Sequence, residues 1–185
     1  RPISRLRLID GCRQVEAPLP RAAAGLSRRC LDAALLRAAA EAGALITRGV
    51  TVREADVANR ALRLQDGTSL TWDTLLLATG KHELRGIARP LADRRASLAV
   101  GLRAALPSSE LRDEALTGTV ELHLFDGGYA GLLLQEDGSA NLCLSVSQAL
   151  LAKVGGPLPL LADLVRRLPG LAERIGQDMR HDISA

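Results

Sequence analysis

Residues 119–147 read TVELHLFDGGYAGLLLQEDGSANLCLSVS, and this stretch decides the fold. It holds three apolar segments of strand length: Thr119–Phe125, Tyr129–Gln135 and Ala140–Ser147. The two connections are Asp126-Gly127-Gly128 and Glu136-Asp137-Gly138. Asp-Gly turns between apolar segments predict β-hairpins, so the stretch predicts an antiparallel meander. Leu98–Leu106 reads as a further strand before it.

The residues that follow the meander read as a helical tail. Residues 148–179 have helical character in two pieces, and the breaks fall at Gly155-Gly156-Pro157 and at Pro169-Gly170. In the other direction, residues 81–97 are charged and loop-like, with Gly86, Pro90 and two arginine pairs. A domain boundary is expected within this charged segment.

An uninterrupted apolar run precedes that boundary. Thr74-Leu75-Leu76-Leu77-Ala78 is closed by Thr79-Gly80. Such a run is typical of a strand that is buried on both faces of a parallel sheet. Upstream of it, Ala61–Gln65, Asp66-Gly67 and Ser69–Trp72 read as strand, turn and return strand. The segments Ala44–Ile46 and Val50–Val52 also have strand composition.

The clearest helix is predicted over Ser27–Gly43. Ser27 is a good N-cap, because its hydroxyl accepts a hydrogen bond from an otherwise unpaired amide, and Gly43 supplies a left-handed stop. A narrow apolar stripe suited to lying close to a sheet is formed by Leu31, Leu35, Ala38, Ala39 and Ala42. Residues 1–25 are irregular, with alternation in Arg5–Leu8 and extended backbone forced by Pro18 and Pro20.

Composition excludes several function classes. The chain carries 24 basic and 21 acidic residues, and the charges are interspersed, so we expect no nucleic-acid partner. One Trp, one Tyr and one Phe are too few for base-stacking platforms. Cys12, Cys30 and Cys143 lie far apart without metal-ligand spacing, which indicates free thiols in a reducing cytoplasm and no metal site. No apolar run has the length of a membrane span.

Three stretches resemble the FAD-dependent oxidoreductases of the aromatic-hydroxylase type, including geranylgeranyl reductase-like and halogenase-like relatives. The first is Leu26–Asp32 with Leu35 and Ala42-Gly43, similar to the helix entry R-x-x-[LF]-D-x-x-L … A-x-x-x-G. The second is Asp66-Gly67, Trp72-Asp73 and Leu75–Gly80 with Lys81-His82, similar to dG … aD-x-v-v-x-A-t-G. The third is Val120–Leu132 with Asn141-Leu142-Cys143, similar to the substrate-domain sheet.

The resemblance implies a set of site residues. The cofactor-binding residues that it implies are Arg28, Val52, Ala78, Thr79 and Gly80. Phe125 and Tyr129 flank one turn of the sheet that covers the substrate face of the flavin in this family, and they are the expected substrate-binding residues. The alternative for this pair is a hairpin anchored by aromatic packing. His82 is expected to be a solvated loop residue and His123 a structural one.

The predicted architecture is α/β: an incomplete, Rossmann-like FAD-binding domain (1–90), an antiparallel substrate-domain sheet (91–150) and a helical tail (151–185). Nothing in the 185 residues reads Gly-x-Gly-x-x-Gly after a strand, so we expect the pyrophosphate-binding loop to be encoded upstream of Arg1. The resemblance implies FAD-dependent reduction or oxygenation of a hydrophobic small molecule, with NAD(P)H as a possible electron donor.

Two alternatives remain open at this point. One is a non-enzymatic ligand-binding module that has kept the fold without the cofactor. The other is an interaction domain whose helical tail docks a partner. No nucleophile, base and orienting residue stand together in a known motif, which is expected if a flavin performs the chemistry.

Overall fold

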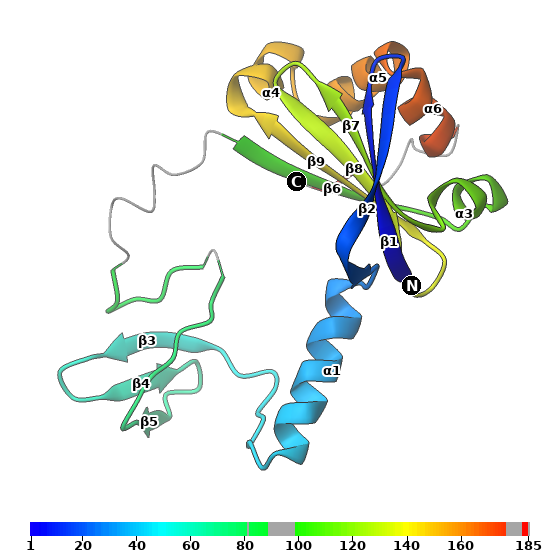
Figure 1. The fold of residues 1–185 in the computed structure, drawn as a ribbon. Coiled ribbons are helices and arrows are strands. Elements are labelled where there is room, and N and C mark those ends of the chain that lie inside the picture. The colour runs from blue at the N-terminus through cyan, green and yellow to red at the C-terminus, as the bar shows by residue number, and fades with distance from the viewer. Residues whose placement is uncertain (81, 89–98, 177–182, 185) are drawn as a thin grey trace. The chain divides into compact units, whose positions relative to one another are not determined.

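The computed structural model describes residues 1–80, 82–88, 99–176 and 183–184 (Figure 1). The chain divides into two compact units, which we treat separately. The first comprises Arg1–Ala34 and Ser97–Ala185, and the second comprises Leu35–Ala96. The division between Ala96 and Ser97 falls within the segment 81–97 where the sequence predicts a domain boundary. Residues 1–34, however, belong to the unit of the later sheet and not to one domain with residues 35–90.

The first unit is built on a seven-stranded sheet in the order β10-β6-β9-β8-β7-β1-β2. Its strands are β1 (Pro2–Asp10), β2 (Arg13–Ala24), β6 (Ala99–Leu106), β7 (Gly118–Phe125), β8 (Gly128–Leu134), β9 (Ala140–Ser147) and β10 (Ile183–Ser184). Every neighbouring pair is antiparallel except β1 and β7, which are parallel. The irregular N-terminus expected from the sequence is thus a long hairpin that extends the sheet.

The meander predicted from residues 119–147 is confirmed. β7 and β8 pair antiparallel, with Phe125 opposite Gly128, and β8 pairs with β9. Both turns use glycine at positive φ, 90° at Gly127 and 84° at Gly138, a conformation that a side chain disfavours. Residue 98 lies outside the described residues, and the strand predicted there is observed from Ala99.

In the described part of this unit, four helices accompany the sheet: α3 (Glu110–Leu116), α4 (Gln148–Val154), α5 (Pro157–Arg167) and α6 (Pro169–Ile175). The tail therefore forms three helices rather than two, with breaks at Gly155-Gly156 and at Leu168. Residues 177–179 of the predicted tail lie outside the described part. The helix α3 is not expected from our sequence analysis.

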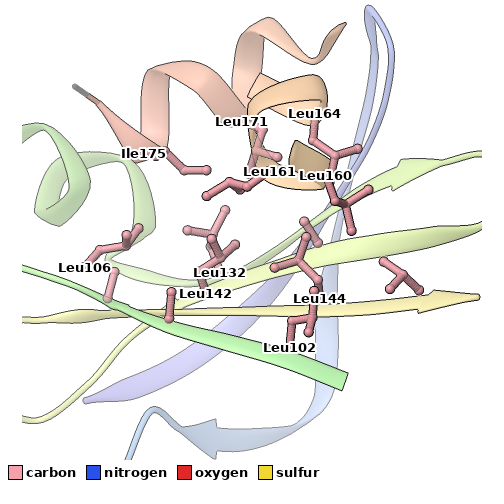
Figure 2. Close-up of a cluster of buried hydrophobic side chains, with 14 of the residues drawn as sticks. Leu102, Leu106, Leu132, Leu142, Leu144, Leu160, Leu161, Leu164, Leu171 and Ile175 are labelled. Carbon is pink, nitrogen blue, oxygen red and sulfur yellow. The ribbon is translucent and has the colours of Figure 1, made fainter. Parts of the chain in front are cut away.

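The core lies between the sheet and the helices α5 and α6 (Figure 2). Alternate residues of β6, β8 and β9 point to it, because successive side chains of a strand face opposite sides. Leu132 and Leu142 are fully buried there, as are Leu160 and Leu164 of α5. Because the chain has few aromatic residues, its core consists mostly of leucine, with alanine, one valine and one isoleucine.

Helix α1 (Arg28–Glu41) forms where the sequence predicts it. The amide of Cys30 donates to Ser27 Oγ at 3.2 Å, so Ser27 is the N-cap, and Gly43 ends the helix at φ 94°. The predicted packing of its apolar stripe is wrong for the described residues. No α1 residue is buried, and Leu35 is 59% exposed, because no described strand lies against that face.

The second unit contains a three-stranded antiparallel sheet of β3 (Val52–Asp56), β4 (Ala61–Leu64) and β5 (Ser69–Thr71). The predicted Asp66-Gly67 hairpin between β4 and β5 is confirmed. Gly67 has φ 87°, and the Thr68 amide donates to Asp66 Oδ1 at 2.9 Å. The isolated bridge of Arg85 to Glu54 places residues near 85 beside β3.

Two strand predictions in this unit are wrong. Residues 74–78 form no strand, and Leu76 is 88% exposed. The segment 44–46 is likewise irregular, and Leu45 is fully exposed. A strand buried on both faces needs hydrogen-bonded neighbours and covering layers, and the described residues offer neither. The apolar side chains of these two segments are therefore not buried by the described residues.

Within the described ranges no single helix has the length and apolar composition of a membrane span. Helices α4 and α5 meet that test only as a pair bent by 91°, and α5 buries Leu160, Leu161 and Leu164 in the core.

Candidate functional site

The large sheet has a second face, opposite the leucine core. Tyr129 and Leu124 lie opposite one another on β8 and β7, and they are 42% and 38% exposed. The next row across the sheet consists of Leu8, Leu122, Gly131, Cys143 and Arg103. We call the residues of these two rows the open face. Its β7 side is apolar, and its β6 side carries polar groups.

The structure separates the two aromatic residues that the sequence groups together. Tyr129 is on the open face, paired with Leu124. Phe125 faces the other way and packs against the leucine core. A shared pocket lined by both rings is therefore excluded, because neighbouring strand positions point to opposite sides. Substrate binding by Phe125 and by Tyr129 stays a prediction.

Arg103 and Cys143 of the open face are linked through Asn141, the next residue of β9 on the same face. Arg103 Nε donates to Asn141 Oδ1 at 2.7 Å, and Asn141 Nδ2 donates to Cys143 Sγ at 2.9 Å. The amide of Asn141 thereby fixes the guanidinium through its Nε atom alone. This leaves a cation at the polar end of the face, beside the exposed Cys143 thiol.

Arg28 is the first residue of α1, and its side chain is 79% exposed. Its Nε atom lies 3.2 Å from Asp32 Oδ1, one helical turn along. A cation at this position is opposed by the positive end of the helix dipole. The guanidinium faces solvent with its Nη atoms outside that ion pair, so it is accessible to an anionic ligand.

A carboxylate from the β8–β9 turn meets the start of this helix. The Ser27 amide donates to Glu136 Oε2 at 2.7 Å, and Ser27 Oγ donates to Glu136 Oε1 at 2.5 Å. The Cys30 thiol adds a third donor. These bonds, led by that from Cys30, lower the pKa of Glu136 to about 2 from its usual 4.5. The negative charge also suits the positive end of α1.

The bonds to Glu136 predict an acid-sensitive helix start. Because the pKa of Glu136 is lowered in the folded chain, its contribution is fully present above pH 4.5 and is lost as the pH falls toward 2. We expect its carboxyl carbon to titrate near pH 2 by NMR, together with the Ser27 amide. Ser27→Ala should move the midpoint upward. A wild-type midpoint near 4.5 would show that the bonds do not persist in solution.

The remaining expected cofactor residues lie in the second unit. Val52 opens β3 and is 37% exposed. Ala78, Thr79 and Gly80 are exposed and end no strand. Thr79 Oγ1 donates to the carbonyl of His82 at 2.8 Å, which makes a tight turn. Whether Arg28 and Thr79-Gly80 face one cleft, as the sequence predicts, stays a prediction, and Lys81 lies outside the described residues.

Gly80 has a conformation that suits close contact with a ligand. Its φ is +60°, and no atom of the described residues lies within 4 Å of where a Cβ would stand. Gly80 therefore has open space around it and a backbone conformation that other residues rarely adopt. A hollow of about 590 Å³ in the second unit lies on the β3–β5 sheet beside Glu54, Asp56 and Arg63, and Gly80 does not line it.

A buried charge cluster under the sheet was missed by the sequence analysis. Glu121 is fully buried in β7 and meets Arg7 of β1 at 2.7 Å and Arg174 of α6 at 3.3 Å. His123, also buried, lies 2.7 Å from Glu121 through Nε2, which confirms its structural role. Hydrogen bonds from His123 and Arg7 hold the pKa of Glu121 below its usual value, against the opposing effect of burial. Two polar residues at alternate positions of an apolar strand were the available signal.

These residues fit FAD only in part. The exposed guanidinium of Arg28 suits a phosphate or a flavin carbonyl oxygen, and Gly80 leaves room for a nucleotide at the backbone. The fingerprint loop that cradles a pyrophosphate does not occur in the 185 residues. A role of Arg28 and Gly80 in binding such a cofactor stays a prediction.

Comparison with known proteins supports this view of the fold. No family model matches the sequence, and no curated protein matches it. Among solved structures, the halogenase PltM gives a TM-score of 0.74 at 13% identity over 98% of this chain and 42% of its own. A further PltM structure is a complex with phloroglucinol and FAD.

Two other similar structures widen the set. The flavin-dependent halogenase CmlS has a TM-score of 0.69 at 16% identity, over 99% of this chain and 37% of its own. The peptidyl tryptophan dihydroxylase QhpG has a TM-score of 0.60 at 20% identity, over 100% of this chain and 40% of its own. The chain therefore spans about two fifths of the length of these proteins. The predicted resemblance is confirmed at the level of the fold: residues 1–185 have the mixed α/β fold of a portion of the flavin-dependent halogenases and hydroxylases.

Proposed function

We propose that this chain is part of an FAD-dependent oxidoreductase that acts on a hydrophobic small molecule. The observation that carries the proposal is the fold match over nearly the whole chain to flavin-dependent halogenases, one of which is seen with FAD. FAD, when bound, supplies hydride transfer or oxygen activation. NAD(P)H is the proposed electron donor, and the free thiols of all three cysteines accord with a cytoplasmic location.

The residues of the chain have separate tasks in this proposal. Arg28 offers a positive charge to the anionic parts of the cofactor, and Gly80 allows its close approach to the backbone. Val52, Ala78 and Thr79 are the further proposed cofactor contacts. The apolar side of the open face, with Leu122, Leu124 and Tyr129, gives a hydrophobic substrate a surface from which it displaces water. Tyr129 also carries a hydroxyl that can orient a polar group of that substrate.

The second candidate is a ligand-binding module without a cofactor. The absence of the pyrophosphate fingerprint from the 185 residues favours it. The visible spectrum of the protein purified from its complete coding sequence separates the candidates. Flavin absorbance supports the oxidoreductase. A co-purified small molecule without flavin supports the module, and neither signal supports an interaction domain.

For residues 1–185 alone we expect no tight FAD binding. Most contacts to the cofactor phosphates come from a glycine-rich loop at a helix N-terminus, and that sequence is not in this chain. Titration followed by flavin fluorescence should show no saturation in the low micromolar range. The protein from the complete coding sequence is the positive control. Saturable low-micromolar binding by residues 1–185 would contradict this prediction.

A further inference from the structure

The β8–β9 turn holds α1 across a separation of 109 residues. Glu136 accepts hydrogen bonds from the amide and hydroxyl of Ser27, and the Cys30 thiol donates to it as well. Ser27 Oγ in turn accepts the amide of Cys30. One carboxylate thus satisfies donors of the first helical turn that would otherwise lack partners. We call this set, Ser27, Cys30 and Glu136, the helix clamp.

The neighbouring carboxylate shows that the helix clamp is specific to one position. Asp137 is exposed in the same turn, yet it bonds only the amide and hydroxyl of Ser139, at 3.0 and 2.6 Å. That pattern is an ordinary turn interaction within the hairpin. Glu136 contributes nothing comparable to the hairpin itself. Its two side-chain partners among the described residues, Ser27 and Cys30, are both on the segment that begins α1.

The helix clamp determines where Arg28 lies in the first unit. Arg28 stands between Ser27 and Cys30, the two residues that bond Glu136. Its own position at the positive end of α1 is electrostatically unfavourable, and a nearby carboxylate offsets that cost. The segment before α1 also contacts the sheet at a second point. Gly25 lies so close to β8 that a Cβ would stand 1.9 Å from the Leu134 carbonyl oxygen. The segment before Arg28 is thus fixed to the sheet at two points.

We infer that Glu136 is a positioning residue for flavin binding: it holds the first turn of α1, and with it the Arg28 guanidinium, against the substrate-side sheet. This inference rests on the proposed function, because it assumes that Arg28 contacts the cofactor. Glu136 itself touches no ligand in this account. The β8–β9 turn thereby couples the sheet of the open face to the helix that carries the cofactor-binding arginine.

The first part of the test measures the helix clamp without a cofactor. In residues 1–185, Glu136→Gln should increase amide hydrogen exchange at Ser27 and Cys30 by about tenfold, since each protected amide loses its charged or ordered partner. Asp137→Asn is the matched control and should leave both amides protected. Unchanged exchange in Glu136→Gln would overturn the inference. Glu136 is exposed, so the variant is expected to fold, as circular dichroism would verify.

The second part uses the protein from the complete coding sequence and measures FAD affinity by flavin fluorescence. Arg28→Ala and Glu136→Gln should each weaken FAD binding by about tenfold, the loss expected for one charge-assisted contact. The double variant should bind no more weakly than the weaker single variant, because Glu136 acts through Arg28. Asp137→Asn should bind like wild type.

Each other outcome is decisive. Losses that multiply in the double variant would show that Glu136 acts independently of Arg28, and they would overturn the inference. Wild-type affinity in Glu136→Gln or in Arg28→Ala would also overturn it, while the proposed function stands. Absence of FAD binding by the wild-type protein would instead refute the proposed function.

Discussion

Glu121→Gln is expected to lower the free energy of unfolding of the first unit by about 3 kcal/mol, the usual cost of removing one partner from a buried ion pair. Glu121 is fully buried and joins three elements, through Arg7 of β1, His123 of β7 and Arg174 of α6. A neutral amide would leave the two guanidinium groups without their shared counter-charge. Among the described residues, His123 Nδ1 has no hydrogen-bond partner. The imidazole therefore has no second contact that would replace the lost interaction with Glu121.

Urea unfolding followed by Tyr129 emission measures this effect, because the single tyrosine lies in the first unit and the single tryptophan, Trp72, in the second. The matched control is Glu16→Gln. Glu16 also pairs with Arg7 at 2.7 Å, but its side chain is 36% exposed, and we expect a loss below about 1 kcal/mol. Equal losses in the two variants would contradict the account of a buried charge cluster.

The second large effect is expected in the leucine core. Leu142→Ala should destabilise the first unit by about 2–5 kcal/mol, from lost burial and the cavity left among Leu132, Leu160 and their neighbours. Leu124→Ala is the control on the opposite face, where the side chain is 38% exposed, and its loss should stay below about 1.5 kcal/mol. The same urea titration measures both. A reversed order would mean that the open face, and not the helix-covered face, is the buried one.

Local structure was predictable because it depends on short-range signals. The meander of β7, β8 and β9 follows from Asp-Gly turns between apolar segments, and so does the β4–β5 hairpin. The start of α1 follows from Ser27 alone. Helix α3 carries no such signal, because Ser109 before it makes no capping hydrogen bond.

Long-range pairing was not predictable in the same way. The parallel pairing of β1 with β7 joins residues more than 100 positions apart, and no turn signal marks it. The Arg7–Glu121 ion pair depends on that pairing, so it could not be found from spacing. The wrong strand prediction at residues 74–78 has a different cause. An apolar run of this length is typical of a buried strand, and the described residues contain no neighbouring strand to pair with it.

The candidate site was predictable only residue by residue. Arg28 is accessible at the helix start as the resemblance implies, and Tyr129 is on the open face. Phe125 differs because the register of β7 turns it toward the core, and register depends on the pairing of the whole sheet. Glu136 belongs to no motif, and the role that we propose for it rests on the fold alone.

The central claim is that this chain contributes to an FAD site, and a flavin-fluorescence titration of the protein from the complete coding sequence tests it most directly. We expect saturable binding in wild type and at least a tenfold loss in Gly80→Val, since a β-branched side chain blocks close backbone approach. Gly49→Val is the control, because Gly49 also has positive φ, 73°, in open space of the same unit. Binding in wild type that is weakened by Gly80→Val and not by Gly49→Val is the predicted result. A wild-type protein that binds no FAD would contradict the claim.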